Sequence, residues 1–474
     1  MRPDLVTNIQ INLDFSDTRP LPTQVAEHIK SLIQHGVIKA GDHIPSTRVL
    51  AQQLNVSRGT IVASYELLAA EGYVVSARGS GTQINPQLAK FPQRWPSQPK
   101  PVSAATQPER HIVSLKPGRP DTKTLVSATW RAAWRQACTQ ISGSLEPAGL
   151  PELRQEISEY VRQMRGLVVE PERIIITAGA REGFMLFLQT MGEVHTIGME
   201  SPGYPSLRKI PTSLGRTVLN IATDHSGINP NQLTDNLDAV LVTPSHQYPY
   251  GGSLSGNRRI AVADWAQRGG KWIIEDDFDS ELRYVGQPLP ALATLAPKNT
   301  LLLGTFSTAL APTIACGYLI APAAILPRLL QLREIFGQPV SHVTQLALAK
   351  YLASGALQRR TQQLRRTYRR RRGIVTTILG HIPSTTLRPI SGGLHAVLLC
   401  ETPAKEVVQR CLAEGVDLTA LQDYWGGTGS ENGIVFGFGA HDDDTLEWAL
   451  NELAYVLTTS HAQPTGAEQA SQRH

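Results

Sequence analysis

Residues 301–322 read LLLGTFSTALAPTIACGYLIAP, and this stretch decides the fold of the larger part of the chain. Its three leucines predict a short buried strand, which ends in a turn of small polar residues at 304–307. A second apolar strand is expected at 316–320. In α/β domains the loops leaving the carboxyl ends of strands are where ligands bind. The sequence therefore predicts a ligand site in the loop that contains Thr305, Ser307 and Thr308.

Around this stretch, short apolar runs alternate with helical patterns. Strands are expected at 174–177, 239–242 and 272–274, each followed by a loop of glycine or polar residues. Such alternation is typical of a parallel sheet with helices on both sides. The strand–glycine–helix step at Gly179 would aim free N–H groups at an anion, although many α/β turns look the same. We therefore expect an α/β domain over residues 111–457, with a smaller subdomain from about 340.

The first 84 residues have a different pattern. One helix is expected at 21–38, and two more are expected after Ser46 and Ser57, because both serines are good N-caps. A small hairpin is expected at 73–84. Helix, tight turn, capped helix and hairpin together predict a winged helix-turn-helix. The residues expected to contact DNA are Arg48, Ser57, Arg58, Gly59 and Thr60, with Arg78, Gly79 and Gly81 in the wing. The alternative is a three-helix packing module, because charges here are nearly balanced.

Two segments are expected to lack a packed core. Residues 85–110 contain six prolines among Gln, Ser and Lys, which predicts an extended linker. Residues 458–474 are polar and poor in apolar side chains, so a disordered tail is expected there.

The overall composition is that of an ordinary globular protein. A chain of 474 residues should form more than one domain. A net charge of +5 is compatible with a polyanionic partner without proving one. The four cysteines show no spacing for zinc or for disulfides, and no start pattern of a signal peptide or long apolar run is present. We expect a cytoplasmic protein with no membrane partner and no metal site.

Residues 44–74, IPSTRVLAQQLNVSRGTIVASYELLAAEGYV, closely resemble the GntR-type DNA-binding domain over 21–84. The run at 301–322 is similar to the "TFSK…AP…R-GY" signature of fold-type-I aminotransferases. Together with EDDFDSELRY at 275–284 and the order of the other loops, it resembles the aminotransferase-like half of MocR regulators, a subfamily of GntR proteins, over about 116–457. The resemblance implies double-stranded operator DNA as a partner, a homodimer, and a pocket that holds pyridoxal 5′-phosphate.

The resemblance also implies which residues form that pocket. Asp276 takes the place of the carboxylate that keeps the pyridine nitrogen protonated. The phosphate would lie at Gly179, Ala180 and Arg181, with the hydroxyls of Thr305 and Ser307, and Tyr204 and Tyr248 fit the pattern of the pocket wall.

Three of the pocket residues depart from the family pattern. Thr308 stands where the Schiff-base lysine belongs, Phe278 replaces a tyrosine, and Ala315 replaces an arginine. Tyr250 also puts a bulky ring where a small hydroxyl is usual. Covalent attachment of the cofactor is therefore not expected, and the pocket would bind it non-covalently at best. The alternative is that Asp276 is a hydrogen-bonded carboxylate at the end of a strand, beside an empty or repurposed pocket.

The resemblance, with these departures, predicts a transcription regulator whose degenerate aminotransferase-like domain dimerises and senses a small effector. Thr308 cannot form an imine or shuttle a proton as lysine does, so a working transaminase is the weaker hypothesis. A platform that binds another protein is a third. The arginine-rich run at 358–372 is interpreted as a solvated helix and not as a DNA contact, and His395 as structural.

Overall fold

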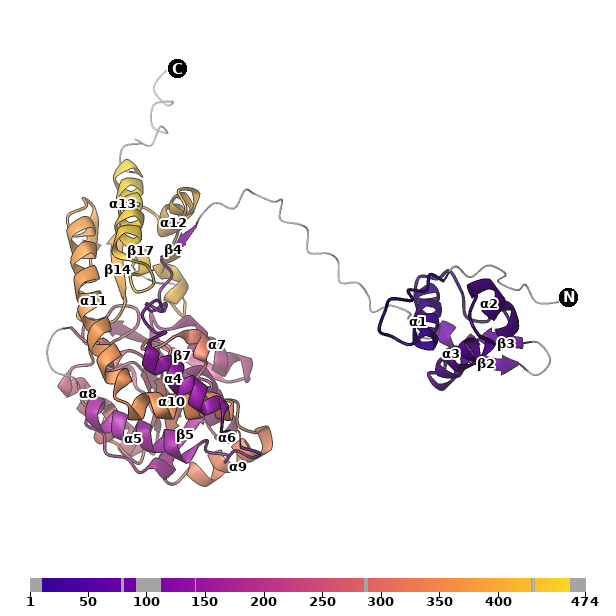
Figure 1. Cartoon of the computed structure of the whole chain (residues 1–474). Coiled ribbons are helices and arrows are strands. Elements are labelled where there is room, and N and C mark those ends of the chain that lie inside the picture. The colour runs from indigo at the N-terminus through magenta and orange to yellow at the C-terminus, as the bar shows by residue number, and fades with distance from the viewer. Residues whose placement is uncertain are drawn as a thin grey trace, which may run out of the picture. The chain divides into compact units, whose positions relative to one another are not determined.

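The computed structural model describes residues 11–77, 81–90, 112–140, 142–284, 289–427, 429 and 431–460. The chain divides into two units, residues 1–109 and 110–474, which we describe separately (Figure 1). Of the expected wing residues, Arg78 and Gly79 lie outside the described part, as does most of the expected linker. No helix in the described residues is both long enough and apolar enough to cross a membrane.

The N-terminal unit is a three-helix module with a small sheet. Its elements are α1 (Leu21–Gln34), β1 (His43–Ile44), α2 (Thr47–Leu54), α3 (Arg58–Ala70), β2 (Val74–Ala77) and β3 (Gly81–Ile84). Val25, Ile29, Leu50 and Ile61 are fully buried between the helices. The expected hairpin β2–β3 is present, and β1 adds a third antiparallel strand that the sequence did not indicate. This is a winged helix-turn-helix.

Part of the expected linker belongs to this unit. Residues Pro86–Lys90 form the 3₁₀ helix η1, and Leu88 packs against the core of the unit. The Asn85 side chain donates a hydrogen bond to the carbonyl of Gly72, 2.9 Å away. The expectation of an extended chain from residue 85 is therefore wrong for these residues, because one apolar side chain and one capping amide suffice to hold a single turn.

The second unit is built on an eight-stranded sheet with the order β5-β12-β11-β10-β9-β6-β7-β8. The strands are β5 (Ile174–Thr177), β6 (Thr196–Ser201), β7 (Thr217–Asp224), β8 (Gly227–Ile228), β9 (Ala239–Val242), β10 (Trp272–Asp277), β11 (Thr300–Thr305) and β12 (Gly317–Ile320). Neighbours are parallel except at β12 and β8, which run antiparallel. The sheet is therefore mixed, and β12 returns the chain directly beside β11 after the loop with Thr308.

Helices cover both faces of this sheet. The helices are α4 (Ala128–Cys138), α5 (Pro151–Arg165), α6 (Ala180–Thr190), α7 (Pro205–Ser213), α8 (Gly256–Gly269), α9 (Leu326–Phe336) and α10 (His342–Ala353). Leu302 shares a buried cluster with α4, α5 and α10, whereas Leu301 and Leu303 share one with α6, α7 and α9. Alternate residues of one strand thus enter opposite layers, as the fully apolar run predicts.

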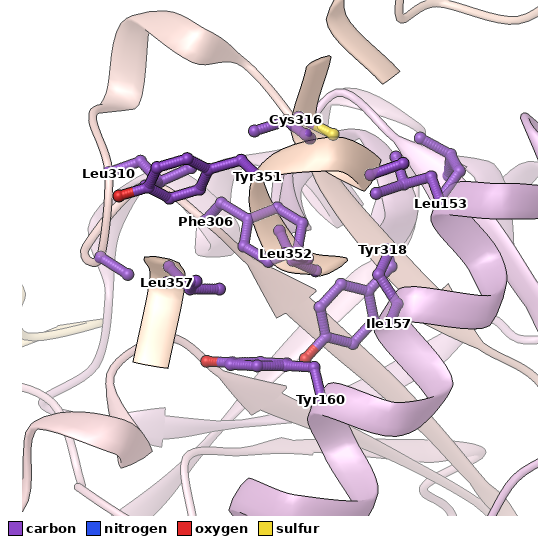
Figure 2. Packing of buried hydrophobic residues seen from close by; sticks show 14 of the residues in the cluster. Leu153, Ile157, Tyr160, Phe306, Leu310, Cys316, Tyr318, Tyr351, Leu352 and Leu357 are labelled. Carbon is purple, nitrogen blue, oxygen red and sulfur yellow. The ribbon is translucent and has the colours of Figure 1, made fainter. Parts of the chain in front are cut away.

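The aromatic side chain of Phe306 anchors the turn after β11 in the buried core. Phe306 is buried and lies between Tyr160 of α5 and Tyr318 of β12, with ring centroids 6.1 and 5.8 Å away (Figure 2). Because Phe306 points into this cluster, its neighbours Thr305 and Ser307 face the other way. The packing of one phenyl ring therefore fixes the direction of two hydroxyl groups.

A smaller layer completes the second unit. It consists of the sheet β13-β14-β17-β16 with α11 (Ala356–Leu379), α12 (Ala404–Ala413) and α13 (Asp443–Ser460). Its strands are β13 (Thr385–Leu387), β14 (His395–Cys400), β16 (Thr419–Ala420) and β17 (Gly433–Gly437), and β4 (Val113–Ser114) pairs with β15 (Val416–Asp417) beside it. α10 and Leu357 pack in the core of the large sheet, and Leu364 begins the smaller core. The packing therefore changes within α11, whereas the sequence placed this boundary at about residue 340. α13 continues to Ser460, so the expected tail is wrong for residues 458–460, and the rest of it lies outside the described residues.

The arginine-rich run lies on α11 and is only partly solvated. Arg360 donates to the carbonyls of Ala309 and Asp121, and Arg371 pairs with Asp121 and Asp443. Both guanidinium groups are buried. The expectation that all these arginines stay in water is wrong, because carbonyl and carboxylate groups of distant segments converge on the helix. These two arginines hold the small layer to the large one.

Candidate functional site

A cavity of about 260 Å³ opens at the carboxyl ends of β5, β10 and β11. All eleven residues that the sequence assigned to a pocket line it: Gly179, Ala180, Arg181, Tyr204, Tyr248, Asp276, Phe278, Thr305, Ser307, Thr308 and Ala315. The structure thus brings these residues together, while their roles toward a ligand stay predictions. The wall also includes Asp279 and His395, which the sequence analysis did not place there.

One end of the cavity is suited to an anion. Gly179 has a φ of +99°, which is accessible mainly to glycine, and it precedes the first turn of α6. The free N–H groups of that turn face the cavity with the hydroxyls of Thr305 and Ser307, which lie 2.9 Å apart. Gly317 allows this close approach, because a Cβ there would stand 2.8 Å from the Cα of Gly179. The geometry resembles a phosphate cradle.

Asp276 lies at the end of β10, on the floor of the cavity. Its Oδ1 is buried and receives no hydrogen bond from any described residue. Burial raises the pKa of this carboxyl to about 8, with further contributions from Asp277, Glu200 and Asp279. The hydrogen bond that the alternative expected at this carboxylate is thus absent at Oδ1 among the described residues. An orphaned buried carboxylate is where a protonated ring nitrogen would fit, so the residues present suit the pyridine ring of the cofactor.

Thr308, which the resemblance places at the lysine position, is buried. Its hydroxyl donates to the carbonyl oxygen of Phe278 and lies 3.4 Å from Oε1 of Glu281. Burial also raises the pKa of Glu281 to about 8. The Thr308 side chain carries a hydroxyl, which is bonded to a main-chain carbonyl, and no amine that could react with a ligand aldehyde. The residues present therefore suit the ring and phosphate of the cofactor, and position 308 offers a hydroxyl.

Aromatic rings form one wall of the cavity. Tyr248 is buried and meets Phe278 and Tyr204 edge to face, with centroids 5.7 and 5.1 Å away. Tyr250 points elsewhere, because its ring lies under the guanidinium of Arg388 and its hydroxyl donates to Glu431. The bulky ring at position 250 therefore does not fill the cavity.

A buried histidine–aspartate pair packs against these rings, and its Asp279 also lines the cavity. His246 Nδ1 lies 2.7 Å from Asp279 Oδ2, and the His246 ring stacks on Phe278. His395 donates from Nε2 to the carbonyl of Pro249, and burial lowers its pKa to about 3, so it is neutral. These residues come from three separate segments, and no local pattern in the sequence links them. The His246 ring packs on Phe278 and the His395 ring packs on Tyr248, so they orient these two side chains.

Two positions, Ala315 and Arg181, decide the charge at the anion end of the cavity. Ala315 is exposed at the end of the loop that precedes β12, and its methyl side chain carries no charge. Arg181 is exposed in the first turn of α6 and lines the cavity, and no hydrogen bond or ion pair to another residue of the described part holds it. Arg181 is therefore the cation available to a phosphate here.

The expected DNA-contact residues of the helices lie on the N-terminal unit. Ser57 caps α3: its Oγ accepts from the N–H of Thr60 at 3.1 Å. Arg48 and Arg58 are exposed near the starts of α2 and α3, and Tyr65 ties the two helices by donating to the carbonyl of Pro45. Gly81 begins β3. The start of α3 is thus fixed and open, as a recognition helix requires.

A winged helix-turn-helix joined to an aminotransferase-type α/β unit defines a class of transcription regulator. Residues 21–84 match the family described as bacterial regulatory proteins, gntR family, and residues 110–425 match aminotransferase class I and II. The chain belongs to the MocR-type regulators of the GntR family, and it is a DNA-binding transcription regulator with an aminotransferase-like domain.

Curated relatives match along nearly the whole chain. The HTH-type pyridoxine biosynthesis transcriptional regulator PdxR of Corynebacterium glutamicum is 54% identical over 454 residues, which is 96% of this chain and 100% of the relative. The probable rhizopine catabolism regulatory protein MocR of Rhizobium meliloti is 27% identical over 97% of this chain and 99% of its own.

Solved structures share the fold of the second unit. An archaeal alanine:glyoxylate aminotransferase superposes with a TM-score of 0.69 at 22% identity, covering 73% of this chain and 91% of its own. A variant of the aspartate aminotransferase of Thermus thermophilus gives a TM-score of 0.66 at 23% identity, covering 73% and 96%. The expected fold class is confirmed: an aminotransferase fold-type-I domain with an N-terminal winged helix-turn-helix.

Proposed function

We propose that this chain is a non-enzymatic, cytoplasmic regulator of vitamin B6 biosynthesis genes. In this proposal its aminotransferase-like domain binds a phosphorylated B6 vitamer without a covalent bond. The observation that carries the proposal is the 54% identity, over the whole of the relative, to a regulator named for pyridoxine biosynthesis. The orphaned carboxylate of Asp276 and the cradle at Gly179 support the vitamer as ligand.

Different residues of the cavity would bind different parts of such a ligand. Asp276 would hold the ring nitrogen, the first turn of α6 with Thr305 and Ser307 would hold the phosphate, and Tyr248 would flank the ring. When bound, pyridoxal phosphate supplies an electron-withdrawing ring to amino compounds. Without a lysine at position 308 no residue of the described cavity can form an imine with it. The domain would therefore act by binding and not by turnover.

Regulation requires that the vitamer favours one arrangement of the protein over another. We propose that the chain acts as a homodimer, as the resemblance to its family implies, and that ligand binding changes how the paired DNA-binding units engage an operator. A small charged ligand is favoured over a protein-interaction platform, because Arg181, Asp276 and the hydroxyls of Thr305 and Ser307 all line the cavity.

The test is a gel-shift titration of the purified full chain. The probes are the promoter of the B6 biosynthesis genes of the same genome, the intergenic DNA beside the gene for this chain, and unrelated promoters of equal length. We expect specific binding to one of the first two, altered by pyridoxal or pyridoxamine 5′-phosphate. Equal affinity for all probes, or no effect of any vitamer, contradicts the proposal. Light scattering of the same sample measures the oligomeric state.

A further inference from the structure

Helix α3 of the N-terminal unit has one buried face and one exposed face. Ile61, Ser64, Tyr65 and Leu68 are buried, and α3 packs against α1 and α2. In a helix-turn-helix the second helix of the motif, here α3, lies in the major groove with its N-terminal residues at the base edges. The exposed face of the first turns of α3 is therefore the surface that meets the base pairs of DNA.

Few side chains on this exposed face are long enough to reach a base. Arg58, Val62 and Glu66 are exposed and follow one another at intervals of four residues, so they lie along one side of the helix. Beside them lie Gly59, which is exposed, and Ala63, which is half-buried. Because these two residues are small, the backbone of α3 can approach a groove closely. The longer side chains of this face are thus one cation, one apolar group and one anion.

Val62 is the apolar member of this set. Its side chain is 36% exposed, and among the described residues it belongs neither to the buried core of the unit nor to the half-buried side chains that pack on that core. Single exposed valines are common on protein surfaces, so exposure alone assigns no role. The position of Val62 does, because it lies one turn after Arg58 on the part of α3 that enters the groove.

The major groove offers one apolar group to such a side chain. Thymine presents its C5-methyl there, whereas the other bases are distinguished by hydrogen-bond donors and acceptors. Val62 has no polar side-chain atom that could read a donor or an acceptor. Arg58 and Glu66 on either side of it carry opposite charges, so this stretch of helix adds no net charge that would attract phosphates. A contact of Val62 with a methyl group would therefore add to sequence specificity and not to general affinity for DNA.

We propose that Val62 is a specificity-determining residue, which reads the C5-methyl group of a thymine in the operator close to the base pairs that Arg58 reaches. The inference goes beyond the proposed function, because it concerns the DNA and holds whichever ligand occupies the cavity. The operator then contains a thymine that is required for its methyl group and not for its hydrogen bonds.

The test begins with selection of the operator from a library of random DNA duplexes by the purified full chain. Each thymine of the selected sequence is then replaced by deoxyuridine, which removes the methyl group and keeps every donor and acceptor of the base. We expect at least one thymine at which this replacement weakens binding about threefold or more in a gel-shift titration. A selected operator without such a thymine, or a selection that enriches no sequence, overturns the inference.

Two variants of α3 assign the methyl contact to Val62. Val62→Ala should bind the thymine and deoxyuridine duplexes equally, and it should keep the fold because alanine is a better helix former than valine. Leu67→Ala is the matched control, since Leu67 is the other exposed large hydrophobic residue of α3 and lies about 140° around the helix from Val62. It should keep the full sensitivity to deoxyuridine. Unchanged sensitivity in Val62→Ala, or an equal loss of sensitivity in Leu67→Ala, overturns the assignment.

Discussion

The hydroxyl of Thr308 donates a hydrogen bond to the main-chain carbonyl oxygen of Phe278, 2.5 Å away. This contact joins the loop after β11 to the loop after β10, the two loops that meet below the cavity. Because the hydroxyl is the donor, its proton points at the carbonyl oxygen of Phe278. Thr308 therefore has a structural role in this chain, because it joins these two loops.

Thr308→Lys should restore covalent chemistry with pyridoxal 5′-phosphate, because the remaining pocket residues fit the ring and the phosphate. We expect a stoichiometric yellow adduct that borohydride fixes at position 308, detected by absorbance and by mass of the peptide. The wild-type chain should show no such adduct in the cavity. A stoichiometric, reducible adduct on another nitrogen of the wild-type cavity would disprove the loss of covalent attachment.

Asp276→Asn should flatten the pH dependence of stability of the ligand-free chain. Burial raises the pKa of Asp276 from 3.8 to about 8, so the folded chain keeps a proton that the unfolded chain loses. The stability from this proton is fully present below the unfolded pKa and is lost as the pH rises through about 8. As the pH rises, the free energy of unfolding of Asp276→Asn should therefore increase relative to that of the wild type by up to ~1.4 kcal/mol per pH unit.

Urea denaturation at several pH values between about 5 and 8 measures this difference. Asp264→Asn is the control, because Asp264 is exposed on α8 and its substitution should follow the wild type at every pH. Parallel curves for the wild type and Asp276→Asn would show that Asp276 is not held protonated by the fold.

Ala315→Arg should tighten the binding of phosphorylated vitamers about tenfold, because it returns a guanidinium to the anion end of the cavity. Ala315 is exposed and already has a φ of +48°, so the longer side chain adds no backbone cost beyond that of alanine. Calorimetric titration measures the gain. Unphosphorylated pyridoxamine is the control ligand, and an equal gain for it would place the new charge away from the phosphate.

Gly317→Ala should destabilise the second unit by ~1–3 kcal/mol. A Cβ at this position would stand 2.5 Å from the carbonyl oxygen of Gly304 and 2.8 Å from the Cα of Gly179, so β12 or the cradle must move. The denaturation midpoint gives the change in stability. Gly373→Ala on α11 is the control, since a Cβ there meets nothing within 4 Å, and an equal loss in both variants would contradict the packing argument.

Arg58→Ala should weaken specific operator binding by ~1–3 kcal/mol if the side chain reads a base. Arg58 is exposed at the first position of α3, directly after the Ser57 cap. Gel-shift titration measures the loss. Arg19→Ala is the control, because Asp17 and Glu27 already engage that guanidinium. Unchanged operator affinity would remove Arg58 from the contact surface.

Much of the site was predictable because its residues follow strands. The carboxyl ends of neighbouring parallel strands meet at one edge of a sheet, so loops after β5, β10 and β11 had to converge. This is why all eleven predicted pocket residues line one cavity. His246 and Asp279 were missed because their pairing depends on how two distant loops approach each other, which leaves no periodic pattern in the sequence.

The sequence by itself determined the order of the two units, the caps of α2 and α3, and the absence of an amine at position 308, because periodicity, capping and residue identity are local properties. The tertiary structure alone decided that Asp276 is orphaned, that Glu281 lies beside Thr308, and that Arg360 and Arg371 are buried on a helix rich in arginine. The cost of a charge depends on which atoms of remote segments surround it, and only the packed fold brings those atoms together.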